Sequence, residues 1–258
     1  MSELPMIRHQ LLQEQRSFWR NPQAAFFTFV LPLALLAILG SVDHDQVPGQ
    51  PGVRGVDNLV PGIIVFGLLA AAYGNLASSI AVLRDEGVLK RIRVTPLRRS
   101  TYLAGHVVSS LVVAGLLSTV TIAGGWLLFD VRLQARAIPG VLLALVVGAA
   151  CLCALGLAVS GFIPNGQAAA PITNASYVPL AIVSGVFYPM DGVPSWLDTI
   201  VGLFPVRRLA DALRAGFDPV HQAPFARPAD VAVLAVWLVA GVLIAHRSFR
   251  WDRHGAKA

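Results

Sequence analysis

The amino-acid sequence alternates long apolar windows with short polar segments. A bilayer core about 30 Å thick requires roughly 17 to 25 apolar residues for a helix to cross it. Because windows of about this length without Lys, Arg, Asp or Glu recur along the chain, the pattern predicts an all-α integral membrane protein with six transmembrane helices. The six predicted spans lie at about 24–42, 61–83, 104–128, 138–162, 169–188 and 231–246.

Two polar segments outside the spans also have helical periodicity. In residues 4–20, apolar side chains recur at helical spacing with arginines between them, which predicts an N-terminal helix lying in the membrane interface. Residues 191–217 contain two short amphipathic stretches, and the second begins at Pro205, a residue favoured in the first turn of a helix. An external segment this apolar is expected to dip back into the interface as a short re-entrant helix pair.

The composition supports the membrane assignment. Of the 258 residues, 55% are hydrophobic and 13% are charged, which is too little polar surface for a water-soluble domain of this size. A single transmembrane domain over 1–258 is expected. The two cysteines form a Cys-x-Cys pair inside an apolar window without a second Cys or His cluster, so neither a disulfide framework nor a zinc site is indicated. Gly156 and Gly161 are expected to permit close helix packing.

The distribution of positive charge predicts the orientation in the membrane. If the N-terminus is cytoplasmic, the segments on that side hold 13 of the 20 Lys and Arg residues, and the external segments hold 7. Cytoplasmic loops carry the excess of Lys and Arg, so a multi-pass protein with both termini cytoplasmic is expected. The isoelectric point of about 10 then reflects this orientation and contact with anionic lipid head groups. No motif for binding nucleic acid is present.

The sequence lacks the residues needed to drive transport by itself. It has no G-x-x-x-x-G-K-[ST] phosphate loop, no His-Glu metal motif and no Ser-His-Asp set, so neither ATPase nor hydrolase activity is expected. The spans contain no carboxylate that could relay a coupling ion. We therefore expect no cofactor or metal on this chain, and energy for uphill transport would come from a partner.

Two longer motifs point to a family. The segment "RDEGVLKRIRVTPLRRSTYLAG" follows the second span, and "SGVFYPMDGVPSWLDTIVGLFPVRRLADALR" follows the fifth. With these motifs the chain resembles the permease subunits of ABC-2-type exporters, and most closely the bacterial drug-resistance permeases typified by the daunorubicin exporter subunit. The resemblance implies a bacterial inner-membrane protein that pairs with a second permease, as a homodimer or a paralogous heterodimer. It also implies two copies of a separate ABC ATPase subunit, which would bind ATP and Mg²⁺.

The resemblance implies that residues 84–100 form a coupling helix and loop that dock on the ATPase. The residues themselves are compatible with this role, because the apolar side chains of the segment can share one helical face and a Thr-Pro step ends the helix. A solvated, positively charged cytoplasmic loop without a partner is the alternative interpretation. The candidate coupling residues are Arg84, Asp85, Glu86, Gly87, Lys90, Arg91, Arg93, Thr95 and Pro96.

Polar and aromatic side chains inside the first, second and fifth spans are candidates for a substrate path. The polar ones could instead form hydrogen bonds between helices, worth about 0.6 to 2 kcal/mol each, and Phe27 could belong to an aromatic belt. The candidate path residues are Phe27, Tyr73, Asn75, Ser79, Asn174 and Tyr177. In the external re-entrant segment, the residues of the family motif are Tyr188, Pro189, Trp196, Asp211 and Arg214.

The resemblance favours export of an amphipathic drug, natural product or lipid-like molecule. The external segments are short and contain no added carbohydrate-binding module, which favours small amphipathic molecules. Two alternatives stay open at this point: a lipid or polysaccharide exporter of the same superfamily, and a membrane scaffold or sensor without transport activity.

Overall fold

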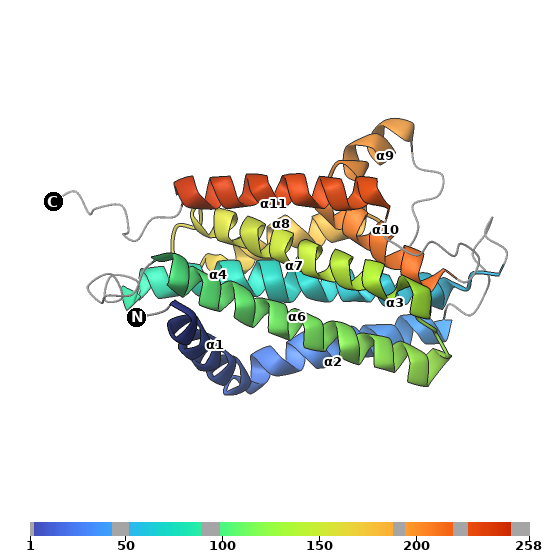
Figure 1. Ribbon diagram of the computed structural model, residues 1–258, viewed down its shortest axis with the longest axis horizontal. Helices are drawn as coiled ribbons and strands as arrows, with labels where there is room; N and C mark the ends of the chain where they lie inside the picture. Colours follow the sequence, from blue (N-terminus) through green and yellow to red (C-terminus); the bar gives the residue numbers. More distant parts are fainter. Residues whose placement is uncertain (1–2, 43–51, 89–98, 188–193, 219–226, 249–258) are drawn as a thin grey trace.

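The computed structural model describes residues 3–42, 52–88, 99–187, 194–218 and 227–248. Within these ranges the secondary-structure elements are helices, so the prediction of an all-α protein is confirmed. Long helices lie side by side along one axis, with α1 splayed at one end and α9 and α10 at the other (Figure 1). The helices are α1 (Glu3–Trp19), α2 (Pro22–Val42), α3 (Gly55–Leu68), η1 (Leu69–Asn75), α4 (Leu76–Asp85), α6 (Arg99–Phe129), η2 (Ala135–Ala137), α7 (Ile138–Ser160), α8 (Ala169–Val183), α9 (Ser195–Gly202), α10 (Pro205–Phe217) and α11 (Pro228–Ser248).

Five helical segments in the described chain are long and apolar enough to cross a membrane. They are Ala25–Val42, Gly55–Asp85, Ala104–Phe129, Ala135–Ser160 and Pro228–Arg247. These segments coincide with five of the six predicted windows. Six complete spans remain a prediction, because the remaining window, 169–188, contains only the 15-residue helix α8. At 1.5 Å per residue that helix is about 22 Å long, less than the hydrocarbon thickness.

Gly185 ends α8 before the predicted limit of the window. Its φ of 64° lies in the left-handed region, which glycine adopts without steric cost. The amide of Gly185 donates to the carbonyl of Ile182, and the amide of Val186 donates to that of Ala181. These two bonds form a Schellman motif, which satisfies carbonyls at a helix C-terminus.

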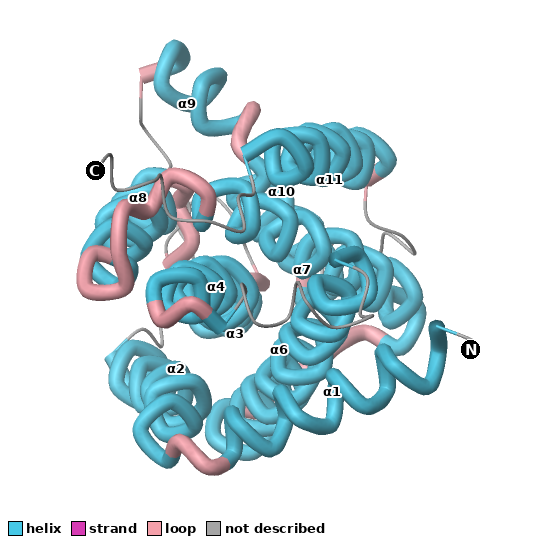
Figure 2. The backbone as a smooth tube through the Cα atoms, turned by 90° about the vertical axis from the view of Figure 1, so that its left-hand side faces the viewer, coloured by secondary structure: helices cyan, strands magenta, loops and turns pink. Residues whose placement is uncertain are grey.

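The second span forms the centre of the bundle. In Figure 2, which looks along the bundle, α3 and α4 lie between α2, α6, α7, α8 and α10. In the most apolar 18-residue window of the segment Gly55–Asp85, 83% of the residues are buried, whereas only 17% are buried in the corresponding windows of α2 and α11. The outer helices therefore expose apolar side chains to the membrane, as expected for a helix with lipid on one side.

Close backbone contact joins the second span to α7. A β-carbon on Gly156 would lie 2.7 Å from the carbonyl oxygen of Tyr73 and 3.2 Å from its Cα. Only a residue without a side chain fits against this backbone, so the close packing predicted for Gly156 is confirmed.

Candidate functional site

A π-helix interrupts the second span and positions two of the candidate path residues. In η1 the backbone bonds reach from residue i to i+5, and this wider turn is frequent at functional sites. Tyr73 is buried near the end of the π-helix, whereas Asn75, its last residue, is exposed. The side chains of Tyr73 and Asn75 therefore lie in different environments, although both residues belong to the same π-helix.

Tyr73 faces α8. Its hydroxyl lies 2.8 Å from that of Ser176, and its ring meets the ring of Tyr177 edge to face with centroids 6.1 Å apart. One turn further along, the hydroxyls of Ser78 and Thr173 are 3.1 Å apart. The structure thus brings Tyr73 and Tyr177 together, and these contacts match hydrogen bonding between helices. Asn174 lies on the exposed side of α8, and Phe27, also exposed, lies on α2.

Asn75 and Ser79 line a second environment, a polar pocket of about 130 Å³ between α1, the η1–α4 segment and α6. Serine hydroxyls and the Glu14 carboxylate line one part of its wall. Two asparagine amides, a histidine ring and four apolar side chains line the rest. The residues that line this polar pocket are Glu14, Ser17, Phe18, Asn21, Ala71, Asn75, Leu76, Ser79, His106, Ser109, Ser110 and Val113. The pocket therefore joins two sequence-predicted path residues to side chains of the N-terminal helix.

Glu14 and His106 form the most polar corner of the pocket. Nδ1 of His106 lies 3.1 Å from Oε2 of Glu14, and Gln10 donates to Oε1 of the same carboxylate at 2.9 Å. Burial raises the pKa of Glu14, and the hydrogen bond from Gln10 partly opposes this change. The His106 side chain is only 4% exposed, and its Nε2 has no hydrogen-bond partner within the described chain.

Gln15 adds a second connection between the same helices. Its side-chain amide donates to the hydroxyl of Ser109 at 2.8 Å and to the backbone oxygen of that residue at 3.1 Å. The glutamate and glutamine of α1 thus hold it against the first half of α6. Glu14 could not be predicted as part of a site, because its partner His106 lies 92 positions away along the chain.

Arg84 and Asp85 connect the end of the second span to the turn after α7. Arg84 donates to the backbone oxygens of Ser160, at 2.9 Å, and Ile163. The Asp85 carboxylate accepts from the amide of Gly166 at 3.0 Å. Both side chains therefore hold the end of α4 against the turn after α7.

Glu86 and Gly87 form the turn that follows α4. Glu86 is exposed, and Gly87 has a φ of 73° with no atom within 4 Å of where a β-carbon would lie. The remaining candidate coupling residues, which lie outside the described residues, are Lys90, Arg91, Arg93, Thr95 and Pro96.

The helices α9 and α10 are joined to the rest of the bundle by arginines. Arg214 of α10 donates to the backbone oxygens of Gly185 and Val186, the latter at 3.2 Å, and to Asp211 at 3.2 Å. Burial lowers the pKa of Arg214, and Asp211 opposes this change. Trp196 on α9 is exposed, whereas Tyr188 and Pro189 lie outside the described residues.

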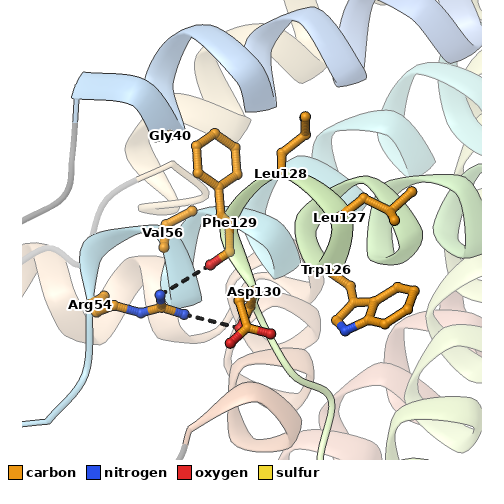
Figure 3. Close-up of a pocket in the computed structure, with 8 residues that line it drawn as sticks. All are labelled: Gly40, Arg54, Val56, Trp126, Leu127, Leu128, Phe129 and Asp130. Atoms are coloured by element: carbon orange, nitrogen blue, oxygen red, sulfur yellow. Dashed lines mark hydrogen bonds between the residues drawn. The ribbon is translucent and has the colours of Figure 1, made fainter.

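A larger cavity, of about 570 Å³, lies at the opposite end of the bundle from the polar pocket. Figure 3 shows Arg54 reaching from the start of α3 to the end of α6, where it donates to the backbone oxygens of Phe129 at 3.0 Å and Asp130 at 3.4 Å. Arg54 also pairs with Asp57 at 2.9 Å. None of the candidate path residues lines this cavity, and its two charged side chains, those of Arg54 and Asp130, are already paired with Asp57 and Arg132.

Comparison with known proteins identifies the family. The profile of the ABC-2 type transporter family matches residues 7–217. The transport permease YvfS of Bacillus subtilis (strain 168) is 24% identical over 195 residues, which are 76% of this chain and 78% of YvfS. The inner membrane transport permease YadH of Escherichia coli (strain K12) is 26% identical over 207 residues, covering 80% of this chain and 79% of YadH.

A third relative carries a name that describes a multidrug ABC transporter permease, YbhR of Escherichia coli (strain K12). It is 24% identical over 193 residues, which cover 75% of this chain and 44% of YbhR. The matched family region includes most of α1, the polar pocket, the turn after α4 and the helices α9 and α10. The chain therefore belongs to the ABC-2 type transporter family and is its multi-pass membrane permease, the non-catalytic transport subunit that works with an ATPase partner.

Proposed function

We propose that this permease exports small amphipathic drugs or natural products across a bacterial inner membrane, as the daunorubicin-exporter-like permeases do. The observation that carries the proposal is the polar pocket, where Asn75 and Ser79 of the central span meet polar side chains of α1 and α6. A polar pocket with an apolar wall suits a molecule that has a polar head and an apolar body.

The energy would come from ATP and Mg²⁺ on a separate ATPase subunit. Two permeases, in a homodimer or a paralogous heterodimer, would pair with two ATPase copies, and residues 84–100 would receive the movement of the ATPase. The bonds of Arg84 and Asp85 to residues 160–166 support this assignment, because a displacement of the turn after α4 would reach α7 and α8 directly.

In this proposal both termini are cytoplasmic, and α8 belongs to the fifth of six spans. The start of α1 and the last turn of α11 lie at the same end of the bundle as the end of α4 (Figure 1). That arrangement agrees with the distribution of Lys and Arg along the sequence. Export of a lipid or polysaccharide is the second candidate, supported by the broad apolar surface that α2 and α11 expose. Membership of a transporter family argues against a scaffold.

The test is efflux from bacteria that lack their own major exporters. The chain is co-expressed with its ABC ATPase partner, and accumulation of several fluorescent amphipathic dyes is measured. We expect lower accumulation with the intact pair and normal accumulation when the phosphate loop of the ATPase is inactivated. Unchanged accumulation of every dye, together with labelled lipid or polysaccharide appearing outside the cells, would replace drug export by the second candidate.

A further inference from the structure

The polar pocket contains more hydrogen-bond acceptors than donors. The Glu14 carboxylate can only accept, and Nδ1 of His106 lies at hydrogen-bond distance from it. A neutral imidazole that donates from Nδ1 leaves Nε2 as an acceptor. This nitrogen is buried and has no partner within the described chain, although His106 lines the pocket. Leaving a buried polar atom without a partner is costly, so a guest with hydrogen-bond donors is favoured.

The polar pocket also carries negative charge, that of the Glu14 carboxylate, without a Lys or Arg among its described lining residues to balance it. Burial of Glu14 disfavours its charged form, so a bound cation would stabilise the carboxylate. The exposed amide of Asn75 and the hydroxyl of Ser79 add further acceptor oxygens from the central span.

The remaining wall is apolar and suits the body of an amphiphile. Phe18, Leu76 and Val113 line it, and an aromatic face additionally attracts cations. The volume of about 130 Å³ has room for several water molecules or for a small polar head group, and not for a whole drug-sized molecule. The rest of such a molecule would extend out of the pocket.

We propose that this pocket binds the primary ammonium head group of an amphipathic substrate, with Glu14 as the counterion and with His106 Nε2 and Asn75 as hydrogen-bond acceptors. The inference rests on the proposed function, since it names the class of head group that the exporter would take up. Glu14 would then recognise the substrate as well as connect α1 to α6.

The first experiment measures binding to the purified chain in phosphatidylcholine nanodiscs. The probes are octylamine, which is protonated at neutral pH, and octanol, which has the same tail without charge. We expect octylamine to bind more tightly than octanol, and Glu14→Gln to weaken octylamine binding about ten-fold while octanol binding stays unchanged. Gln13→Glu is the matched control, because Gln13 is exposed on the same helix and does not line the pocket.

A second variant keeps the proposal testable if Glu14→Gln fails to fold. Asn75→Asp adds a carboxylate to the pocket from the central span and should tighten octylamine binding. In the double variant Glu14→Gln/Asn75→Asp, the new carboxylate should restore octylamine binding. Equal binding of octylamine and octanol by the unaltered chain, or an unchanged preference in folded Glu14→Gln, would overturn the proposal.

Two further measurements are needed. The first distinguishes a lipid amine from a soluble amine as the natural guest, and the second distinguishes failure of the exporter proposal from failure of the ammonium-site proposal. Replacing part of the phosphatidylcholine by phosphatidylethanolamine should weaken octylamine binding if a lipid amine occupies the pocket, and should leave it unchanged if the natural guest is a soluble amine. Loss of dye efflux with intact octylamine selectivity would contradict the exporter proposal alone. Normal efflux without any amine selectivity would contradict this inference alone.

Discussion

At the scale of single residues, two glycines differ sharply in their surroundings. Gly156 of α7 packs against the backbone of Tyr73, and a β-carbon there would lie 2.7 Å from a carbonyl oxygen. Gly115 of α6 is exposed, with no atom within 4 Å of the corresponding position. A backbone atom cannot rotate away as a side chain can, so only the first position forbids a side chain.

We expect Gly156→Val to destabilise the protein by about 1–3 kcal/mol, because it separates α7 from the central span. Gly115→Ala should leave stability unchanged or raise it by up to about 1 kcal/mol, since alanine favours the helix. Thermal unfolding of the purified variants measures both. Equal stability of Gly156→Val and the unaltered protein would mean that the two backbones are not in contact.

The Tyr73 hydroxyl provides a residue-scale test of the bond between the second and fifth spans. Tyr73→Phe removes the bond to Ser176, whose own hydroxyl still donates to the backbone oxygen of Thr173 at 2.7 Å. We therefore expect a loss of only about 0.6 to 1.7 kcal/mol in thermal unfolding experiments. Tyr177→Phe is the control, because it leaves the Tyr73 hydroxyl in place. A loss of expression in Tyr73→Phe alone would indicate a larger structural role.

At the scale of elements, Arg214 connects α10 to the turn that follows α8. Arg214 binds the carbonyls that follow α8, while the solvent-exposed pair of Arg132 and Asp130 joins only neighbouring residues of one turn. Removing Arg214 would leave Asp211 without one of its two cations and would free two backbone oxygens in a buried place. Removing Arg132 would affect only groups that water can solvate.

We expect Arg214→Met to lower the free energy of unfolding by about 1–3 kcal/mol, from unsatisfied hydrogen-bonding groups. Arg132→Met should cost about 0.2–1 kcal/mol at most, as for other exposed ion pairs. Thermal unfolding and the protease sensitivity of α9 and α10 are the measurements. Similar values for the two variants would show that Arg214 does not fix α10.

The turn after α4 is the second element-scale test. Gly87 lies in the left-handed region, which asparagine visits and β-branched residues avoid. Gly87→Asn should therefore preserve the direction in which the chain leaves α4, whereas Gly87→Val should change it at a cost of about 1–3 kcal/mol. We expect Gly87→Val to weaken docking of the permease on the ATPase, or to reduce substrate-stimulated ATP hydrolysis by the complex. Normal stimulation of ATP hydrolysis in Gly87→Val would mean that residues 84–100 only set the orientation of the chain in the membrane and do not couple it to the ATPase.

At the scale of the whole molecule, orientation can be tested with described, exposed positions. Arg132 follows α6 at one end of the bundle, and Gln13 lies on α1 at the other. With both termini cytoplasmic, Arg132→Cys should react with a membrane-impermeant thiol reagent added to intact cells, and Gln13→Cys should react only after lysis. The native Cys151 and Cys153 are buried and should give little background. The opposite labelling pattern would invert the topology.

The apolar windows predicted most of the bundle, and the exceptions have local physical reasons. The second span begins at Gly55, before the window expected from 61, because Arg54 bonds the buried Asp57 and allows a charge inside the helix. α8 ends early because Gly185 closes a Schellman motif. Each boundary is set by a single residue, Arg54 or Gly185. A count of apolar positions cannot locate such a boundary.

The candidate site was predictable only in part. Polar residues in an apolar window identified Asn75 and Ser79, which line the polar pocket. The contribution of Glu14 required the position of α1 against α6, which is a tertiary contact without a local pattern. Tyr73 and Asn75 are two positions apart and therefore lie on opposite sides of the helix, but which helices they meet there is a tertiary contact that no hydrophobic period indicates.

That π-helix also has an evolutionary meaning. A turn closed from i to i+5 holds one residue more than an α-helical turn, so η1 corresponds to a one-residue insertion in the second span. An ancestral permease without it would align to this chain with a single gap inside residues 69–75. One residue added to an uninterrupted α-helix would turn everything after it by about 100°. Because the wide turn of η1 accommodates the added residue, α4 keeps its face, and Ser79 still lines the polar pocket.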